Sequence, residues 1–158
     1  MGYDTSRVAP ISEDLTKEDL SCQIVRGYSL ANKVAESFQK GTVLVSGEWA
    51  VKTANGMERP GVASSNMSML VIGGTERFDS QATGKVTVIQ SSQVQVKTNK
   101  FAEQGTYAEG TELTVKNLGA QEAIVSPATA GDYIVAKVLE CGNGFLVYET
   151  VPVIVKKA

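Results

Sequence analysis

The chain has 158 residues, enough for one domain that buries a core without help from disulfides or metals. It carries 15 Lys and Arg against 17 Asp and Glu, a net charge of −2, and lacks the concentrated positive surface that nucleic-acid binding requires. It contains no histidine, which excludes His-based catalytic triads and the usual zinc spacings.

Two cysteines, Cys22 and Cys141, lie far apart in the sequence. Such a pair predicts two reduced thiols, with a bridge between the amino-terminal segment and the carboxy-terminal hairpin as the alternative. No apolar run reaches the length of a membrane span, and the first residues lack the charged-then-apolar profile of a signal peptide. We therefore expect a soluble chain made in a cytoplasm, with no membrane partner.

Residues 1–27 differ in composition from the rest and predict an extended arm, which leaves residues 28–158 as the folded domain. Acidic residues after Ser12 and Thr16 favour a short helical turn. The apolar side chains of this arm are sparse among polar ones, so they could lie on a neighbouring surface. The alternative is a terminus without fixed contacts.

The first part of the domain is expected to contain two strands. Residues 31–38 fit either helical spacing or an irregular strand, and the strongly β segment that follows favours the strand. Residues 41–51 predict a strand with a bulge or barrel corner at Gly47. Trp49 is expected in the core, with an interface position as the alternative. Residues 53–61 are expected to form a loop.

Further strands follow at short spacing. Residues 67–72 predict a strand closed by two glycines, and residues 75–84 a polar loop. In residues 85–90 and 93–97, valines alternate with polar residues, which predicts a hairpin with one face inward. Residues 106–115 and 123–125 add two more strand segments.

The carboxy-terminal segment, residues 131–155, predicts a β-hairpin because two runs rich in β-branched and aromatic residues flank Gly142-Asn143-Gly144. Its first strand is apolar on both faces. One face carries Ile134, Ala136 and Val138, and the other carries Tyr133, Val135 and Leu139. Either a closed barrel or a second subunit must cover such a strand. In total, about eight antiparallel strands predict an all-β barrel or sandwich.

No residue pattern typical of catalysis is found. The candidate carboxylates are Glu48, Asp79, Asp132 and Glu140, and none has a recognisable spacing. Asp132 follows a glycine at the start of a strand and is expected to accept hydrogen bonds from nearby backbone N–H groups. No P-loop, dinucleotide fingerprint, nucleophile elbow or calcium loop is present. We therefore expect no enzyme activity and no catalytic, metal-binding or cofactor-binding residue.

Five segments together resemble capsid decoration proteins of tailed bacteriophages, also called cement or head-stabilising proteins. They are KGTVLVSGEWAV (residues 40–51), RPG (59–61), FDSQATGKVTV (78–88), YAEGTEL (107–113) and AGDYIVAKV (130–138). The resemblance covers roughly residues 28–155, and its most telling part is Gly131-Asp132 followed by a long apolar strand.

The resemblance implies a structural virion protein that binds the major capsid protein on the outside of the expanded head, commonly as a trimer. The host bacterial cytoplasm would be its place of synthesis. The hypothetical capsid contacts are Tyr3, Arg7, Val8, Ile11 and Leu15. The hypothetical subunit-interface residues are Tyr133, Val135, Leu139 and Tyr148. The alternatives are a tail-tube or other tail or head-completion subunit and, less favoured, a surface-binding β module or an enzyme on a trimeric barrel.

Overall fold

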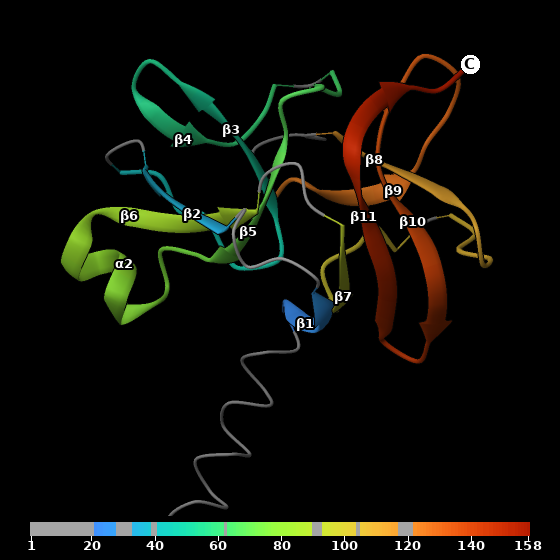
Figure 1. Ribbon diagram of the computed structural model, residues 1–158, viewed down its shortest axis with the longest axis horizontal. Coiled ribbons are helices and arrows are strands. Elements are labelled where there is room, and N and C mark those ends of the chain that lie inside the picture. Colours follow the sequence, from blue (N-terminus) through green and yellow to red (C-terminus); the bar gives the residue numbers. More distant parts are fainter. Residues whose placement is uncertain are drawn as a thin grey trace, which may run out of the picture.

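The computed structural model in Figure 1 describes residues 21–27, 33–38, 41–61, 63–89, 93–103, 105–116 and 122–158. In this part of the chain, eleven strands form two antiparallel sheets and one short helix is present. The predicted all-β class is confirmed. Neither sheet closes on itself by strand pairing, so the fold is sandwich-like, and it has more than the eight strands expected.

The larger sheet has six strands in the order β1-β7-β11-β10-β8-β9. Their bounds are β1 (Gln23–Gly27), β7 (Val94–Thr98), β8 (Glu112–Lys116), β9 (Ile124–Pro127), β10 (Tyr133–Gly142) and β11 (Phe145–Lys156). The long hairpin β10–β11 forms its centre. The sequence places this hairpin correctly, and its loop is Asn143-Gly144, where Gly144 has the positive φ of 76° that the turn needs.

The smaller sheet has five strands in the order β2-β6-β5-β3-β4. Their bounds are β2 (Lys33–Ser37), β3 (Trp49–Thr53), β4 (Gly56–Glu58), β5 (Met69–Gly73) and β6 (Lys85–Ile89). The sheet curls strongly, as shown by a single isolated bridge between Phe38, just after β2, and Met57 in β4, which links the two edge strands. The strand preferred for residues 31–38 is confirmed as β2.

Two hydrophobic cores result, and the smaller sheet contributes to both. Successive residues of its strands point to opposite sides, so that Leu70 and Ile89 join one core while Val71 and Val88 join the other. The first core lies against the larger sheet and contains Trp49, which is 3% exposed, as predicted. The second core lies inside the curl. Both faces of the inner strand β5 are therefore largely buried within the chain, whereas one face of the edge strand β2 is exposed.

The strand predicted for residues 41–51 is wrong in its first part. Strand β3 begins only at Trp49, and residues 41–48 form a loop held by hydrogen bonds to β5 and the segment after it. Gly47 N–H donates to Val71 O (2.8 Å), and Thr75 N–H donates to Leu44 O (2.7 Å). Gly47 has φ of +99°, so it turns the chain instead of continuing a strand.

Two further expectations are corrected. The polar loop predicted for residues 75–84 contains a helix, α2 (Phe78–Thr83), which ends at Gly84 in the left-handed conformation. The hairpin predicted for residues 85–97 does not form, since β6 pairs with β2 and β5 while β7 pairs with β1 and β11 in the other sheet. Alternation correctly predicted two strands, but it carries no information on their partners.

Residues 53–61, expected as a loop, contain the short strand β4, which forms a hairpin with β3. Strand β1 lies inside the predicted arm and pairs with β7, so the folded body begins before residue 28. Cys22 is buried and Cys141 exposed, and neither forms a disulfide, as predicted.

Candidate functional site

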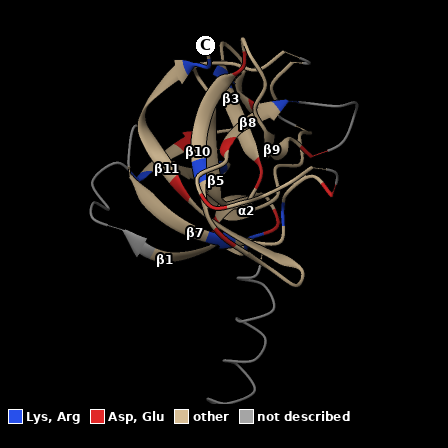
Figure 2. Ribbon diagram, turned by 90° about the vertical axis from the view of Figure 1, so that its right-hand side faces the viewer, with Lys and Arg blue, Asp and Glu red and all other residues tan. Residues whose placement is uncertain are grey.

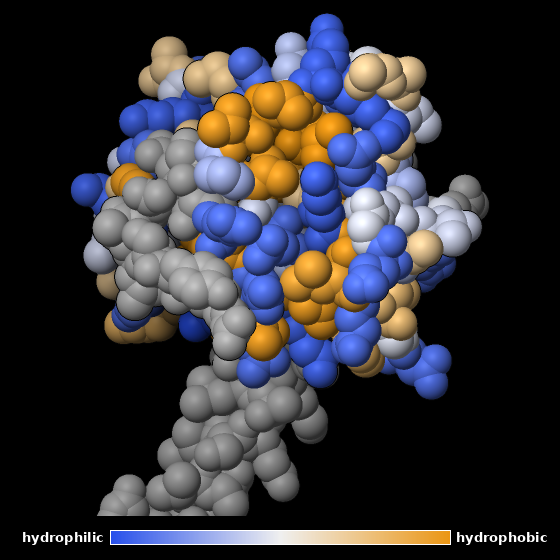
Figure 3. Space-filling view, turned by 45° about the vertical axis from the view of Figure 1, so that its right-hand side comes forward, coloured by the Kyte–Doolittle hydropathy of each residue, from blue (hydrophilic) through white to orange (hydrophobic). Residues whose placement is uncertain are grey.

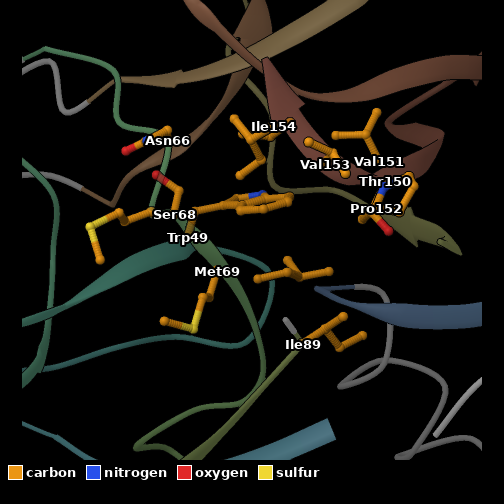
Figure 4. Close-up of a pocket in the computed structure, with 13 residues that line it drawn as sticks. Trp49, Asn66, Ser68, Met69, Ile89, Thr150, Val151, Pro152, Val153 and Ile154 are labelled. Atoms are coloured by element: carbon orange, nitrogen blue, oxygen red, sulfur yellow. The ribbon is translucent and has the colours of Figure 1, made fainter. Parts of the chain in front are cut away.

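A groove with a volume of about 460 Å³ lies between the two sheets (Figure 4). Thirteen residues line it: Trp49, Asn66, Met67, Ser68, Met69, Leu70, Ile89, Val135, Thr150, Val151, Pro152, Val153 and Ile154. They come from β3, β5 and the residues before it, β6, β10 and the carboxy-terminal half of β11. In Figure 4 the Trp49 ring lies between Ile154 on one side and Met69 and Ile89 on the other.

An irregularity in the β10–β11 ladder shapes one wall of the groove. Ala136 pairs with Thr150 and Ile134 with Val155, so residues 151–154 stand opposite the single residue Val135. Pro152, which has no N–H to donate to a ladder, lies inside this stretch. In a regular strand, successive side chains alternate between two faces. The bulge breaks this alternation, so that side chains of β11 point into the groove and toward solvent.

Behind the groove, its lining residue Trp49 packs against a second buried aromatic residue, Tyr148. Trp49 and Tyr148 have ring centroids 6.5 Å apart. Burial raises the pKa of the Tyr148 phenol, and the adjacent Trp49 N–H partly offsets this. Neither Trp49 Nε1 nor Tyr148 Oη makes a hydrogen bond of ordinary geometry. The pair therefore serves as an apolar support, with its polar atoms turned toward each other.

None of the thirteen lining residues is ionisable. The polar side chains are Asn66, Ser68 and Thr150, and the Thr150 hydroxyl accepts a hydrogen bond from Val94 N–H (2.9 Å). A reaction that transfers protons needs ionisable groups within reach of the substrate. The groove is instead suited to binding an apolar, uncharged segment.

The rim of the groove exposes large apolar side chains. Met67 is 60% exposed and Val153 is 69% exposed, and Val155, two residues further along β11, is 54% exposed. On the face in Figure 3, apolar side chains gather in clusters bordered by hydrophilic ones. Clustered exposed apolar residues are typical of surfaces that contact another protein.

The four candidate carboxylates are not brought together at the groove. Glu48 is fully buried and forms a two-point ion pair with Arg59, whose Nε donates to Oε1 at 2.9 Å. This hydrogen bond raises the pKa of Arg59. Asp132 stabilises a turn, as predicted, while Asp79 and Glu140 are exposed on α2 and β10. Glu48 and Asp132 have structural partners, and no pair of these carboxylates lines a common cavity.

The predicted interface residues have different positions. Tyr148 and Val135 are buried in the chain's own core, at 0% and 1% exposure, so they are not available to a second subunit. The sequence could not show this because the same apolar pattern suits an intramolecular cover. Tyr133 and Leu139 are half-buried, and their interface role stays a prediction. The predicted capsid contacts, Tyr3, Arg7, Val8, Ile11 and Leu15, lie outside the described residues.

No local pattern in the sequence marks the groove as a whole. The one available signal is Pro152, because a proline inside an apolar strand indicates a bulge. The sequence around Met67 and Ser68 does not show that these residues line the groove, because their position there depends on how the smaller sheet packs on the larger one. The lining of the groove is a tertiary feature.

Within the described residues, His, Cys, Asp and Glu side chains form no group of three that could hold a metal ion. The same part of the chain has no helix with the length and apolar character of a membrane span. Comparisons with protein-family models, with curated proteins and with solved structures gave no match.

Proposed function

We propose that the chain is a structural virion protein that decorates the outer surface of a tailed-phage head and stabilises the expanded shell. The observation that carries this proposal is the groove, an apolar contact surface without ionisable groups on an all-β body. The resemblance in residues 28–155 to decoration proteins supplies the partner, which is the major capsid protein.

The surface charges are consistent with contact between proteins. Lys and Arg are interspersed with Asp and Glu around the strands (Figure 2), and the net charge is −2. A mixed surface of this kind disfavours non-specific attachment to nucleic acid, which depends on clustered positive charge. The exposed apolar rim at Met67 and Val153 supplies the area that a protein partner would cover.

A decoration protein binds many identical sites, so modest affinity at each contact is sufficient when several contacts act together. In an oligomer, each later contact is effectively intramolecular, which raises the overall affinity without new chemistry. The arm and the apolar rim are the two regions proposed to make such contacts. The proposed oligomer is a trimer.

The test is binding to purified expanded heads of the phage that encodes the chain, quantified by gel densitometry and located by cryo-electron microscopy. We expect saturable occupancy on the outer surface for the full chain and reduced occupancy after deletion of residues 1–20. Circular dichroism of the shortened chain is the control for folding, since both described cores use only residues after 21.

Two results would count against the proposal. A folded chain that does not bind expanded heads would contradict a decoration role. Purified protein that forms hexamers or stacked tubes would instead favour the tail-tube alternative. Unchanged occupancy after the deletion would exclude the arm as an anchor and leave the decoration role intact.

A further inference from the structure

The groove and the amino-terminal arm match each other in chemistry. No lining residue of the groove is ionisable, so a bound segment must itself be uncharged, because a buried charge without a partner is costly. Residues 1–20 carry five acidic and two basic side chains, a net charge of 2 − 5 = −3. The longest uncharged run among them is residues 8–12, Val-Ala-Pro-Ile-Ser. This run contains the two branched apolar residues Val8 and Ile11.

The place where the arm joins the body determines whether the arm can reach the groove of its own chain directly. Ser21 O accepts a hydrogen bond from Thr98 Oγ1, at the end of β7 that pairs with Leu146. The groove lies beyond the other end of β7, where Val94 N–H contacts Thr150. In Figure 1, β1 lies low in the middle of the body and the carboxy-terminal end of β11 lies at its upper right. The chain therefore enters β1 at the end of β7 opposite to the contact between Val94 and Thr150.

The length of the arm is sufficient to reach another copy. Twenty extended residues span at most about 66 Å, and the nine residue steps from Ser12 to Ser21 span about 30 Å. To fill the groove of its own chain, the arm would have to reverse beyond Thr98 and run back along the sheet. Binding to a neighbouring copy needs no reversal.

We propose that residues 8–12 of one copy bind in the apolar groove of a neighbouring copy, with Val8 and Ile11 against the surface formed by Trp49, Met67 and Val153. Each copy gives one arm and receives one. Passed from copy to copy in one direction, the contact is heterologous and closes into a ring where the rotation permits; exchanged between two copies, it gives a symmetric dimer. This contact assembles the chain itself, and it does not require a capsid. Under this proposal Val8 and Ile11 bind between copies, and Tyr3, Arg7 and Leu15 are the arm residues left for contact with a shell.

The first experiment measures the mass of full-length variants by light scattering coupled to size exclusion. Val8→Asp with Ile11→Asp places charges on the arm, and Val153→Asp places one on the exposed rim of the groove. We expect an oligomer for the wild type and monomers for both variants. Matched controls are Thr5→Asp with Thr16→Asp on the arm and Val43→Asp, at a residue that is 58% exposed and outside the groove; both should stay oligomeric.

Mixing the two defective variants tests exchange between copies. The V8D/I11D chain keeps an intact groove, and the V153D chain keeps an intact arm, so the mixture should form one-to-one heterodimers. If the arm binds its own groove, no heterodimer forms and the wild type is itself a monomer. Either result would overturn the proposal.

The second experiment uses the only tryptophan as a probe. A synthetic peptide of residues 1–20, titrated into full-length V8D/I11D protein, should shift the emission of Trp49, which lines the groove. The peptide with both Asp substitutions should bind at least about tenfold more weakly. An unchanged emission, or equal affinity of the two peptides, would show that the groove does not bind this run. Head binding is measured separately, so the decoration role can fail or stand independently.

Discussion

Asp132 shows how one buried carboxylate stabilises the start of β10. Its Oδ2 accepts hydrogen bonds from Thr129 N–H (2.9 Å) and Thr129 Oγ1 (3.0 Å), and its Oδ1 lies 2.9 Å from Lys116 Nζ. Burial raises the pKa of Asp132, but the hydrogen bonds from Thr129 and Lys116 lower it by more. The carboxylate therefore stabilises the fold in its ionised form.

Asp132→Asn should lower the free energy of unfolding by about 1–3 kcal/mol at pH 7, because a charge-assisted hydrogen-bond set is weakened. A depressed pKa contributes stability above the unfolded value of about 3.9, and this contribution is lost as the pH falls further. The difference between wild type and D132N should therefore shrink by pH 3. Urea unfolding at both pH values measures it, with the exposed Asp79→Asn as the control. A difference that is independent of pH would contradict this role.

At the scale of elements, the loop of residues 41–48 holds the smaller sheet together without being a strand. Gly47 is its critical point, because an added Cβ would lie 2.1 Å from the Ser21 carbonyl oxygen, and because its φ of +99° is unfavourable for other residues. Gly41 has a similar φ of +85°, but nothing lies within 4 Å of an added Cβ. A substitution at Gly41 therefore tests the cost of the positive φ alone, and a substitution at Gly47 tests that cost together with the steric clash.

Gly41→Ala should destabilise the chain by about 1 kcal/mol, the cost of a left-handed backbone for a residue with a Cβ. Gly47→Ala should cost more than about 3 kcal/mol, because the Ser21 backbone must also move. Thermal or urea unfolding of both variants measures the difference. Equal losses of stability in the two variants would mean that the Ser21 backbone moves aside at no measurable cost in free energy.

At the scale of the whole molecule, the two cores are not independent. Strands β3, β5 and β6 each send side chains into both, so loss of one core exposes the shared sheet. We therefore expect a single cooperative unfolding transition, in which the larger and the smaller sheet separate and unfold together.

Val86→Ala tests this coupling. Val86 is fully buried in the second core, whereas Trp49 belongs to the first. The substitution should remove about 1–3 kcal/mol of stability and shift the midpoints of Trp49 fluorescence and far-ultraviolet circular dichroism equally. The exposed Val43→Ala should change little. Separate midpoints for the two probes would show that the curled sheet unfolds alone.

The sequence by itself determined the all-β class, the carboxy-terminal hairpin, the burial of Trp49 and the turn made by Asp132. These features depend on local patterns: alternation of side chains, the glycine-rich loop, and the short reach of an aspartate to its own backbone. Such patterns act over a few residues, so they can be recognised without knowing the rest of the fold.

Only the tertiary structure decided the partners of β6 and β7, the loop of residues 41–48, and the groove. An apolar pattern marks a buried face but not what covers it. The sequence therefore suits a second subunit over Val135 and Tyr148 equally well, although the chain buries both residues itself. The groove joins residues 66–70 to residues 150–154, and its shape depends on the packing of two sheets and on the bulge at Pro152. Contacts between such distant segments arise from global packing, and local sequence patterns do not specify them.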